Sequence, residues 1–289
     1  GVPGVVVALV VQLTIKEPPR GYSDPQDTAT KPRAHWAEAF HELKHKPSFW
    51  WMAIGASLVA FVGYGVVSFQ APFLQREHGL DVRDAAVNFG APLSFLAAIG
   101  TFLGGYLTEK MTPRSPTAVA WIPAVGLLLA VPAYIAAFFL DDLKMIFLLW
   151  AIASVCHYAY LGAQYNIGQS VVSARSRATA IATLLILVSL IGNGVGPYFV
   201  GFMSDWLMNI QLAGSEFGGS LTPALCNATE VALTPAESDV CAIANSTGLK
   251  QAMAVTVCWF ILAAFCFFMS ARTLKEDFVV ELETTEPTS

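Results

Sequence analysis

Residues 49–74 read FWWMAIGASLVAFVGYGVVSFQAPFL, a run without a single Asp, Glu, Lys or Arg. As an α-helix this run would extend about 39 Å at 1.5 Å per residue, which exceeds the roughly 30 Å hydrocarbon core of a bilayer. Its interior Gly and Pro residues are tolerated in membrane helices. The run therefore predicts a membrane-spanning helix.

The remaining sequence has the same character. Of the 289 residues, 55% are hydrophobic and 13% are charged, whereas soluble domains carry about 25% charged residues. This composition excludes a nucleic-acid-binding protein and argues against a soluble enzyme. Five more apolar runs are long enough to cross a bilayer, at 85–107, 117–140, 145–172, 178–207 and 249–271. We therefore predict an all-α membrane protein with a six-helix bundle over 49–271.

The segments outside the bundle are expected to serve different purposes. Residues 1–15 are apolar but too short to span a bilayer, so we interpret them as the end of a helix that starts upstream. Residues 16–48 form a polar linker, in which Trp36, Phe40 and Leu43 share one face of an amphipathic helix. Residues 208–248 form a long loop, and 272–289 form a tail.

Basic residues predict the orientation of the spans. Of the 16 Lys and Arg, four lie on the side of the 208–248 loop: Arg76, Arg83, Lys144 and Lys250. The others lie on the side of the linker and the tail. Because cytoplasmic loops carry an excess of Lys and Arg, we predict a multi-pass protein of the cell membrane with the linker and C-terminus in the cytoplasm. The 208–248 loop is then external.

Two spans share a glycine pattern. Gly100-x3-Gly104 lies in the second span and Gly192-x3-Gly196 in the fifth. These two spans cross the membrane in opposite directions, as an inverted repeat of three helices each would place them. Small residues at this spacing also let helices pack closely.

The chain resembles the C-terminal half of a major facilitator superfamily transporter. Gly105-x3-Glu109-Lys110 is similar to the superfamily's loop signature G-x-x-x-D-[RK], with Glu in place of Asp. Other stretches are similar to the Spinster-type subfamily: Ala71-Pro72-Phe73-Leu74-x-Arg76-x-His78-Gly79, Gln169-Ser170-Val171-Val172, Arg175-x-Arg177-Ala-Thr-Ala180 and Gly196-Pro197. The resemblance implies a missing N-terminal half of six spans, of which residues 1–15 are the remnant. Eukaryotic Spinster-type proteins are associated with sphingolipid and lysolipid export, which the resemblance does not assign to this chain.

Polar side chains mark the helix faces that line a path, because a polar group in hydrocarbon is costly unless it faces a partner or water. The span 145–172 is the most polar. The predicted substrate cavity is formed by Tyr64, Gln70, Asn88, His157, Tyr160, Gln164 and Asn193. The alternative is hydrogen bonding between helices without any ligand.

Charged residues at the cytoplasmic helix ends predict a gate. Glu109, Lys110, Arg175 and Arg177 would hold the inner side shut in one state, or else simply anchor the helices as positive-inside charges. We expect no cofactor. Coupling to a proton or sodium gradient is open, with His157 as a titratable group and any coupling carboxylate in the missing half.

One cysteine pair and one histidine motif bear on cross-linking and metal binding. Cys226 and Cys241 share the external loop, where an oxidising environment favours a disulfide between them. His41-Glu42-x-x-His45 matches a zinc-protease motif, but it lies in a short linker without a scaffold, so we expect no metal site.

These features favour a secondary transporter that works by alternating access on an amphipathic or lipid-like solute, with the bilayer and the missing half as partners. A carrier of small organic anions or sugars is the first alternative. A non-transporting receptor or scaffold is the second. An enzyme is disfavoured because His157 has no acidic partner in any span.

Overall fold

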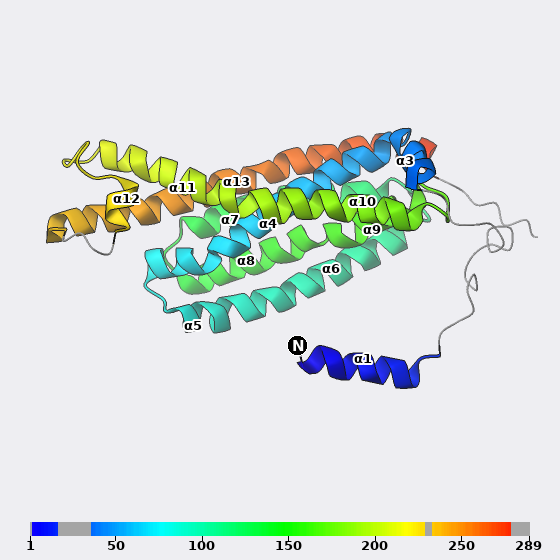
Figure 1. The fold of residues 1–289 in the computed structure, drawn as a ribbon, viewed down its shortest axis with the longest axis horizontal. Coiled ribbons are helices and arrows are strands. Elements are labelled where there is room, and N and C mark those ends of the chain that lie inside the picture. The colour runs from blue at the N-terminus through cyan, green and yellow to red at the C-terminus, as the bar shows by residue number, and fades with distance from the viewer. Residues whose placement is uncertain (1, 17–35, 229–232, 279–289) are drawn as a thin grey trace, which may run out of the picture.

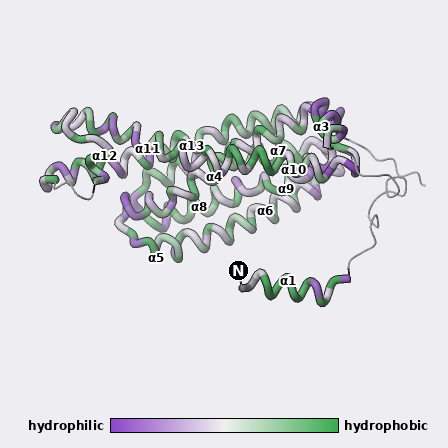
Figure 2. The backbone as a smooth tube through the Cα atoms, viewed as in Figure 1, coloured by the Kyte–Doolittle hydropathy of each residue, from purple (hydrophilic) through white to green (hydrophobic). Residues whose placement is uncertain are grey.

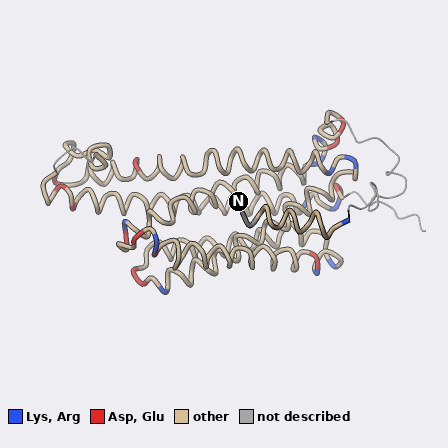
Figure 3. Tube along the Cα trace, turned by 60° about the horizontal axis from the view of Figure 1, so that its bottom comes forward, with Lys and Arg blue, Asp and Glu red and all other residues tan. Residues whose placement is uncertain are grey.

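The structure, a computed structural model, describes residues 2–16, 36–228 and 233–278, and its regular elements there are all helices. Six helical spans are long and apolar enough to cross a membrane, and they lie side by side in an elongated bundle (Figure 1). The middle of the bundle is hydrophobic (Figure 2) and the charged residues gather toward its two ends (Figure 3). The predicted all-helical, six-span fold is confirmed.

Several spans are composed of more than one helical segment. The spans in chain order are α4 (Pro47–His78); α5 (Val82–Ala85), η1 (Ala86–Gly90) and α6 (Ala91–Met111); α7 (Ala118–Phe138); α8 (Leu143–Tyr158) and α9 (Tyr160–Ser170); α10 (Arg177–Ser189), η2 (Leu190–Val195) and α11 (Gly196–Ala213); and α13 (Pro235–Asp277). Three short helices lie outside them: α1 (Val2–Thr14), α3 (Trp36–Lys44) and α12 (Pro223–Cys226).

The second and fifth spans share the same irregularity. Each contains a π-helical segment, η1 or η2, directly before an α-helix with Pro92 or Pro197 near its start. Proline lacks the N–H that continues the α-helical hydrogen-bond ladder, so the helix is perturbed just before it. The matching position of these perturbations supports the internal repeat.

The repeated glycines lie at helix crossings. A Cβ at Gly100 would stand 2.5 Å from the Val155 carbonyl oxygen of α8, and one at Gly104 would collide with Ala159. In the other half, a Cβ at Gly192 would stand 2.7 Å from Ala60 Cβ of α4. The fourth glycine, Gly196, packs against the Phe61 carbonyl of α4. The second span thus crosses the fourth, as the fifth crosses the first.

The core is built around α4 and α13. Gly55 of α4 faces Phe267 of α13, because a Cβ there would be 3.1 Å from that ring. Further along α4, Phe73 meets Phe138 of α7 and Trp150 of α8, with ring centroids 5.7 Å apart in both pairs. All three of these aromatic side chains are buried. Three spans therefore meet in one aromatic cluster.

The amphipathic linker segment is a helix, and only part of its apolar face is buried against the bundle. α3 buries Ala39 and Leu43 completely, while Trp36 and Phe40 are 69% and 44% exposed. The contact between α3 and the bundle also includes a hydrogen bond from Trp50 Nε1 to the Leu43 carbonyl at 3.0 Å. Exposed aromatic side chains on such a helix are typical of segments that lie at a membrane interface.

The 208–248 region is more helical than the predicted loop. α11 continues to Ala213, and α13 starts at Pro235. A capping box fixes this start, since Thr234 and Glu237 bond each other's backbone N–H. Cys226 and Cys241 form a disulfide that joins the segment around α12 to α13. The helices therefore extend beyond the apolar runs because capping and the cross-link stabilise polar turns that hydropathy alone leaves out.

Candidate functional site

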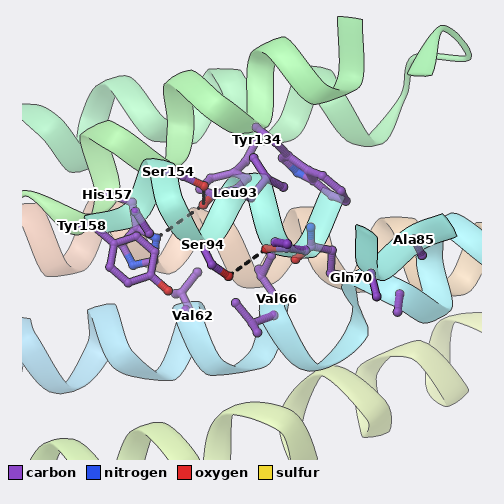
Figure 4. Close-up of a pocket in the computed structure, with 18 of the residues that line it drawn as sticks. Val62, Val66, Gln70, Ala85, Leu93, Ser94, Tyr134, Ser154, His157 and Tyr158 are labelled. Carbon is purple, nitrogen blue, oxygen red and sulfur yellow. Dashed lines mark hydrogen bonds between the residues drawn. The ribbon is translucent and has the colours of Figure 1, made fainter. Parts of the chain in front are cut away.

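A cavity of about 460 Å³ lies between α4, η1, α6 and α8, with α7 and α13 at its back (Figure 4). Most of its wall is aliphatic or aromatic, and the described lining contains no Asp, Glu, Lys or Arg. Its polar lining residues are Gln70, Ser94, Tyr134, Ser154, His157 and Tyr158. A largely apolar pocket with a few convergent polar groups is the usual form of a small-molecule site.

A polar group at the back of the cavity is centred on Tyr134. Its hydroxyl lies 3.4 Å from Nδ1 of His157 and 3.5 Å from the Ser154 hydroxyl (Figure 4). His157 is 3% exposed, and its ring packs on Phe260 at a centroid distance of 4.7 Å. The imidazole fits because Gly63 faces it, where a Cβ would be 3.0 Å from His157 Cε1. Contacts from α4, α7 and α13 therefore fix the orientation of this imidazole, which belongs to α8.

Two further polar side chains, Ser94 and Gln70, line the cavity. The Ser94 hydroxyl donates to the Gly90 carbonyl at 2.7 Å, which satisfies its proton within its own helix. The amide nitrogen of Gln70 is buried and has no hydrogen-bond partner in the described structure. An unpaired buried donor is costly, so Gln70 offers a hydrogen bond to a bound molecule.

The predicted cavity residues separate into two groups. Gln70 and His157 line the cavity. Tyr160 stacks on the His157 ring at 6.0 Å, and Gln164 lies one turn further along α9 with a side chain that is 1% exposed. The Gln164 carbonyl oxygen has no partner among the described residues. Two of the predicted residues thus line the cavity, and Tyr160 and Gln164 are buried beyond His157 on the same span.

Tyr64, Asn88 and Asn193 lie elsewhere. Tyr64 is 44% exposed and sits beside Gly192, whereas Asn88 and Asn193 are exposed within η1 and η2. Large exposed side chains also occur on the two spans that carry Asn88 and Asn193, among them Phe95, Phe102, Leu190 and Tyr198. In a bilayer, lipid can cover exposed apolar side chains, whereas an amide within a span is costly unless it faces a polar partner or water.

Sequence reasoning missed the contribution of α7 and α13. These two spans carry few polar residues and contribute none of the predicted cavity residues, yet Tyr134 of α7 and Phe260 of α13 line the cavity. The available signal was that Tyr134 is the lone hydroxyl-bearing side chain within α7. Hydropathy could not reveal its role, because one inward hydroxyl barely changes the average of a span.

α6 ends and α10 begins at the end of the bundle that carries α3 (Figure 1), and the predicted gate residues lie at these two helix ends. Glu109 and Lys110 lie in the last turn of α6, with the Lys110 ammonium 5.6 Å from the Tyr106 ring centroid. Arg175 lies in the turn before α10, and Arg177 is the first residue of α10. That turn is held from the linker, because Glu42 accepts hydrogen bonds from the Ser173 N–H at 2.7 Å and its hydroxyl at 3.0 Å.

Comparison with known proteins places these features in context. Residues 1–197 match the model of the Major Facilitator Superfamily. The chain is 29% identical over 185 residues to an MFS-type efflux pump of Mycolicibacterium smegmatis, covering 64% of this chain and 43% of that protein. It is 25% identical to protein spinster of Drosophila melanogaster over 94% of this chain and 50% of that protein.

A solved structure shows the same arrangement. The chain is similar to a bacterial homolog of the human lysosomal transporter Spinster in an inward-facing, unoccupied conformation, with 48% sequence identity and a TM-score of 0.79. The alignment covers 96% of this chain and 59% of that one. The chain thus spans about half the length of the relatives that it matches.

Proposed function

Because this chain belongs to the major facilitator superfamily of transporters, we propose that it forms one six-helix half of a secondary carrier for an amphipathic, lipid-like solute. The observation that carries this proposal is the cavity of about 460 Å³, whose wall is apolar except for a few uncharged hydrogen-bonding groups and His157. Such a wall suits a molecule with a hydrocarbon portion and a polar end.

The exposed face supports a second half as partner. Phe95, Phe102 and Tyr198 are 70%, 72% and 73% exposed on α6 and α11. Asn88 and Asn193 lie at the matching π-helical segments of the same two spans. Amides at that depth are costly in lipid. We infer that another six-helix half covers this face, and that Tyr64, Asn88 and Asn193 line the cavity between the halves.

Alternating access follows from the repeat. The second and fifth spans cross their partners at glycines, with backbones in close contact. Where glycine replaces a larger side chain at a crossing, the helices can move against each other with little steric hindrance, as alternating access about a central site requires. Glu109, Lys110, Arg175 and Arg177 lie at the α3 end, which we propose is cytoplasmic because most Lys and Arg gather there (Figure 3).

We propose that any coupling to a proton or sodium gradient depends on a residue of the other half or on His157. The described spans carry their carboxylates toward the ends of the bundle (Figure 3). His157 lies at the back of the cavity, where its Nδ1 is 3.4 Å from the Tyr134 hydroxyl. Proton uptake by the carrier would therefore depend on this imidazole or on a carboxylate of the second half.

The test uses the full-length carrier, with both halves, reconstituted in proteoliposomes. We expect uptake of a labelled lysophospholipid to exceed that of a small organic anion or a sugar. A Gln70→Leu, His157→Phe double variant should lower lysophospholipid uptake at least tenfold, because both polar anchors are lost. Leu129→Ala, at a 58% exposed position on α7, is the matched control. Preferred uptake of an anion or sugar would support the alternative carrier, and specific binding without uptake would support a receptor.

A further inference from the structure

A second, shallower groove of about 310 Å³ lies where α3 meets the first turns of α4. It is lined by Lys44, His45, Pro47, Trp50, Trp51 and Ile54. It shares no lining residue with the cavity between α4 and α8. α3 and the first turns of α4 lie at one end of the bundle (Figure 1). A groove lined by their residues is therefore expected near one membrane–water interface.

The aromatic wall of the groove is fixed by its neighbours. Trp50 donates its indole N–H to the Leu43 carbonyl at 3.0 Å, and its ring meets the edge of Phe40 at 6.2 Å. Trp51 packs edge-to-face on Phe265 of α13, with centroids 6.1 Å apart. The groove is therefore preformed, and the bound molecule need not order these rings.

The groove changes character from its mouth inward. Lys44 and His45 stand at the end of α3, while Ile54 lies further into α4 and is 48% exposed. Tryptophan rings between a basic mouth and an aliphatic floor are the arrangement found at membrane–water interfaces. A lipid could therefore place its headgroup at the basic residues and its acyl chain along the tryptophan rings and Ile54.

Charge complementarity points to an anion at the mouth. Among the described residues that line the groove none is acidic, and the nearby Glu42 accepts hydrogen bonds from Ser173 on the bundle side. Arg272 lies on the α13 face that carries Phe265, two turns nearer the α3 end. In the part of the chain that the structure describes, Lys44 and Arg272 form no salt bridge, whereas Lys250 pairs with Glu77.

We propose that this groove binds an anionic phospholipid, with its headgroup phosphate at Lys44, His45 and Arg272 and an acyl chain along Trp51 and Ile54. Basic pockets beside membrane helices hold such headgroups, and each Lys or Arg contributes about a fivefold gain in binding. The proposal does not rest on the transported solute, because this lipid occupies the outside of the bundle.

The experiment uses the full-length carrier in phosphatidylcholine vesicles that contain either brominated phosphatidylglycerol or brominated phosphatidylcholine. Bromine quenches nearby tryptophan fluorescence. We expect stronger quenching by the phosphatidylglycerol, with much of the difference lost in Trp51→Phe. A Lys44→Gln, Arg272→Gln double variant should weaken phosphatidylglycerol binding about twentyfold to thirtyfold. The matched control is Lys16→Gln with Arg114→Gln, which removes the same charge outside the groove.

Three results would overturn the proposal. Equal quenching by the two brominated lipids, or equal loss of binding in the control pair, overturns the proposal. Suppression of the difference by inorganic phosphate, without lipid retained on the protein in native mass spectrometry, would also overturn it by showing a free-anion site. Because quenching requires no transport, a carrier that fails the transport test still reports on this groove.

Discussion

Asp277, in the last turn of α13, caps the first turn of α4 through Ser48, which lies 229 positions earlier. Its Oδ2 accepts hydrogen bonds from the Ser48 backbone N–H at 2.9 Å and from the Ser48 hydroxyl at 2.5 Å. Ser270 returns a hydrogen bond to the Ser48 carbonyl at 2.8 Å. A carboxylate at a helix N-terminus satisfies free N–H groups and complements the helix dipole. The first and last spans of the bundle are thus fastened at one end.

Replacing this carboxylate should destabilise the bundle. Asp277 is 7% exposed, and hydrogen bonds to charged groups contribute about 1.5–3 kcal/mol each. We expect Asp277→Ala to lower the free energy of unfolding by about 2–3 kcal/mol, measured by denaturation in detergent micelles. The neighbouring Glu276→Ala, at an exposed position, should change it little. Equal stability of the two variants would contradict the capping role.

Releasing Glu42 should free the linker helix without unfolding the spans. Its two hydrogen bonds to Ser173 join α3 to the turn before α10. We expect Glu42→Ala to speed amide exchange in α3 about tenfold, since about 1–2 kcal/mol of local stability is lost. Hydrogen exchange with mass spectrometry checks this, with the exposed Glu38→Ala as control. Unchanged exchange in α3 would show that Ala39 and Leu43 hold the helix on their own.

The crossing glycines offer matched pairs within single spans. A Cβ at Gly100 would stand 2.5 Å from the Val155 carbonyl, whereas one at Gly105 meets nothing within 4 Å. The same contrast holds for Gly192 and Gly194. We expect Gly100→Ala and Gly192→Ala to cost about 1–3 kcal/mol through overpacking, measured as lower thermal stability. Gly105→Ala and Gly194→Ala should be neutral or stabilising, and a reversed order would refute the crossing geometry.

The hydroxyl of Tyr134 is expected to matter for transport more than for folding. It lies between His157 and Ser154, at 3.4 and 3.5 Å. Tyr134→Phe keeps the packed ring and removes one hydrogen bond of about 1 kcal/mol. We expect about a fivefold lower rate of solute uptake with thermal stability within about 1 kcal/mol of the parent. Parent-like uptake would show that this polar group only packs the bundle.

The disulfide should fasten the segment between α11 and α13. It joins Cys226 and Cys241, 15 positions apart. A cross-link over a loop of that length contributes about 3 kcal/mol in the chain-entropy description. We expect Cys226→Ser to expose this segment to limited proteolysis while the spans remain resistant. Cys258→Ser, at an exposed free cysteine, is the control. Equal cleavage patterns would show that the capping box alone holds the segment.

Several features follow from the sequence by itself. Hydropathy alone gives the six spans, because each must satisfy its backbone internally across about 30 Å of hydrocarbon. The repeated glycines at 100, 104, 192 and 196 indicate the internal repeat, because close helix packing requires small residues at a fixed spacing. The position of Gln70 and His157 at an interior wall also follows from their cost in lipid.

Only the tertiary structure decides which polar groups meet. Tyr134 and His157 are 23 positions apart on different spans, and Asp277 reaches Ser48 across most of the chain. Helical periodicity gives the face on which a side chain lies, but not the neighbouring helix or the depth at which the two cross. Those depend on the fit of whole surfaces, so the same polar pattern sends His157 into a cavity and leaves Asn88 and Asn193 on an exposed face.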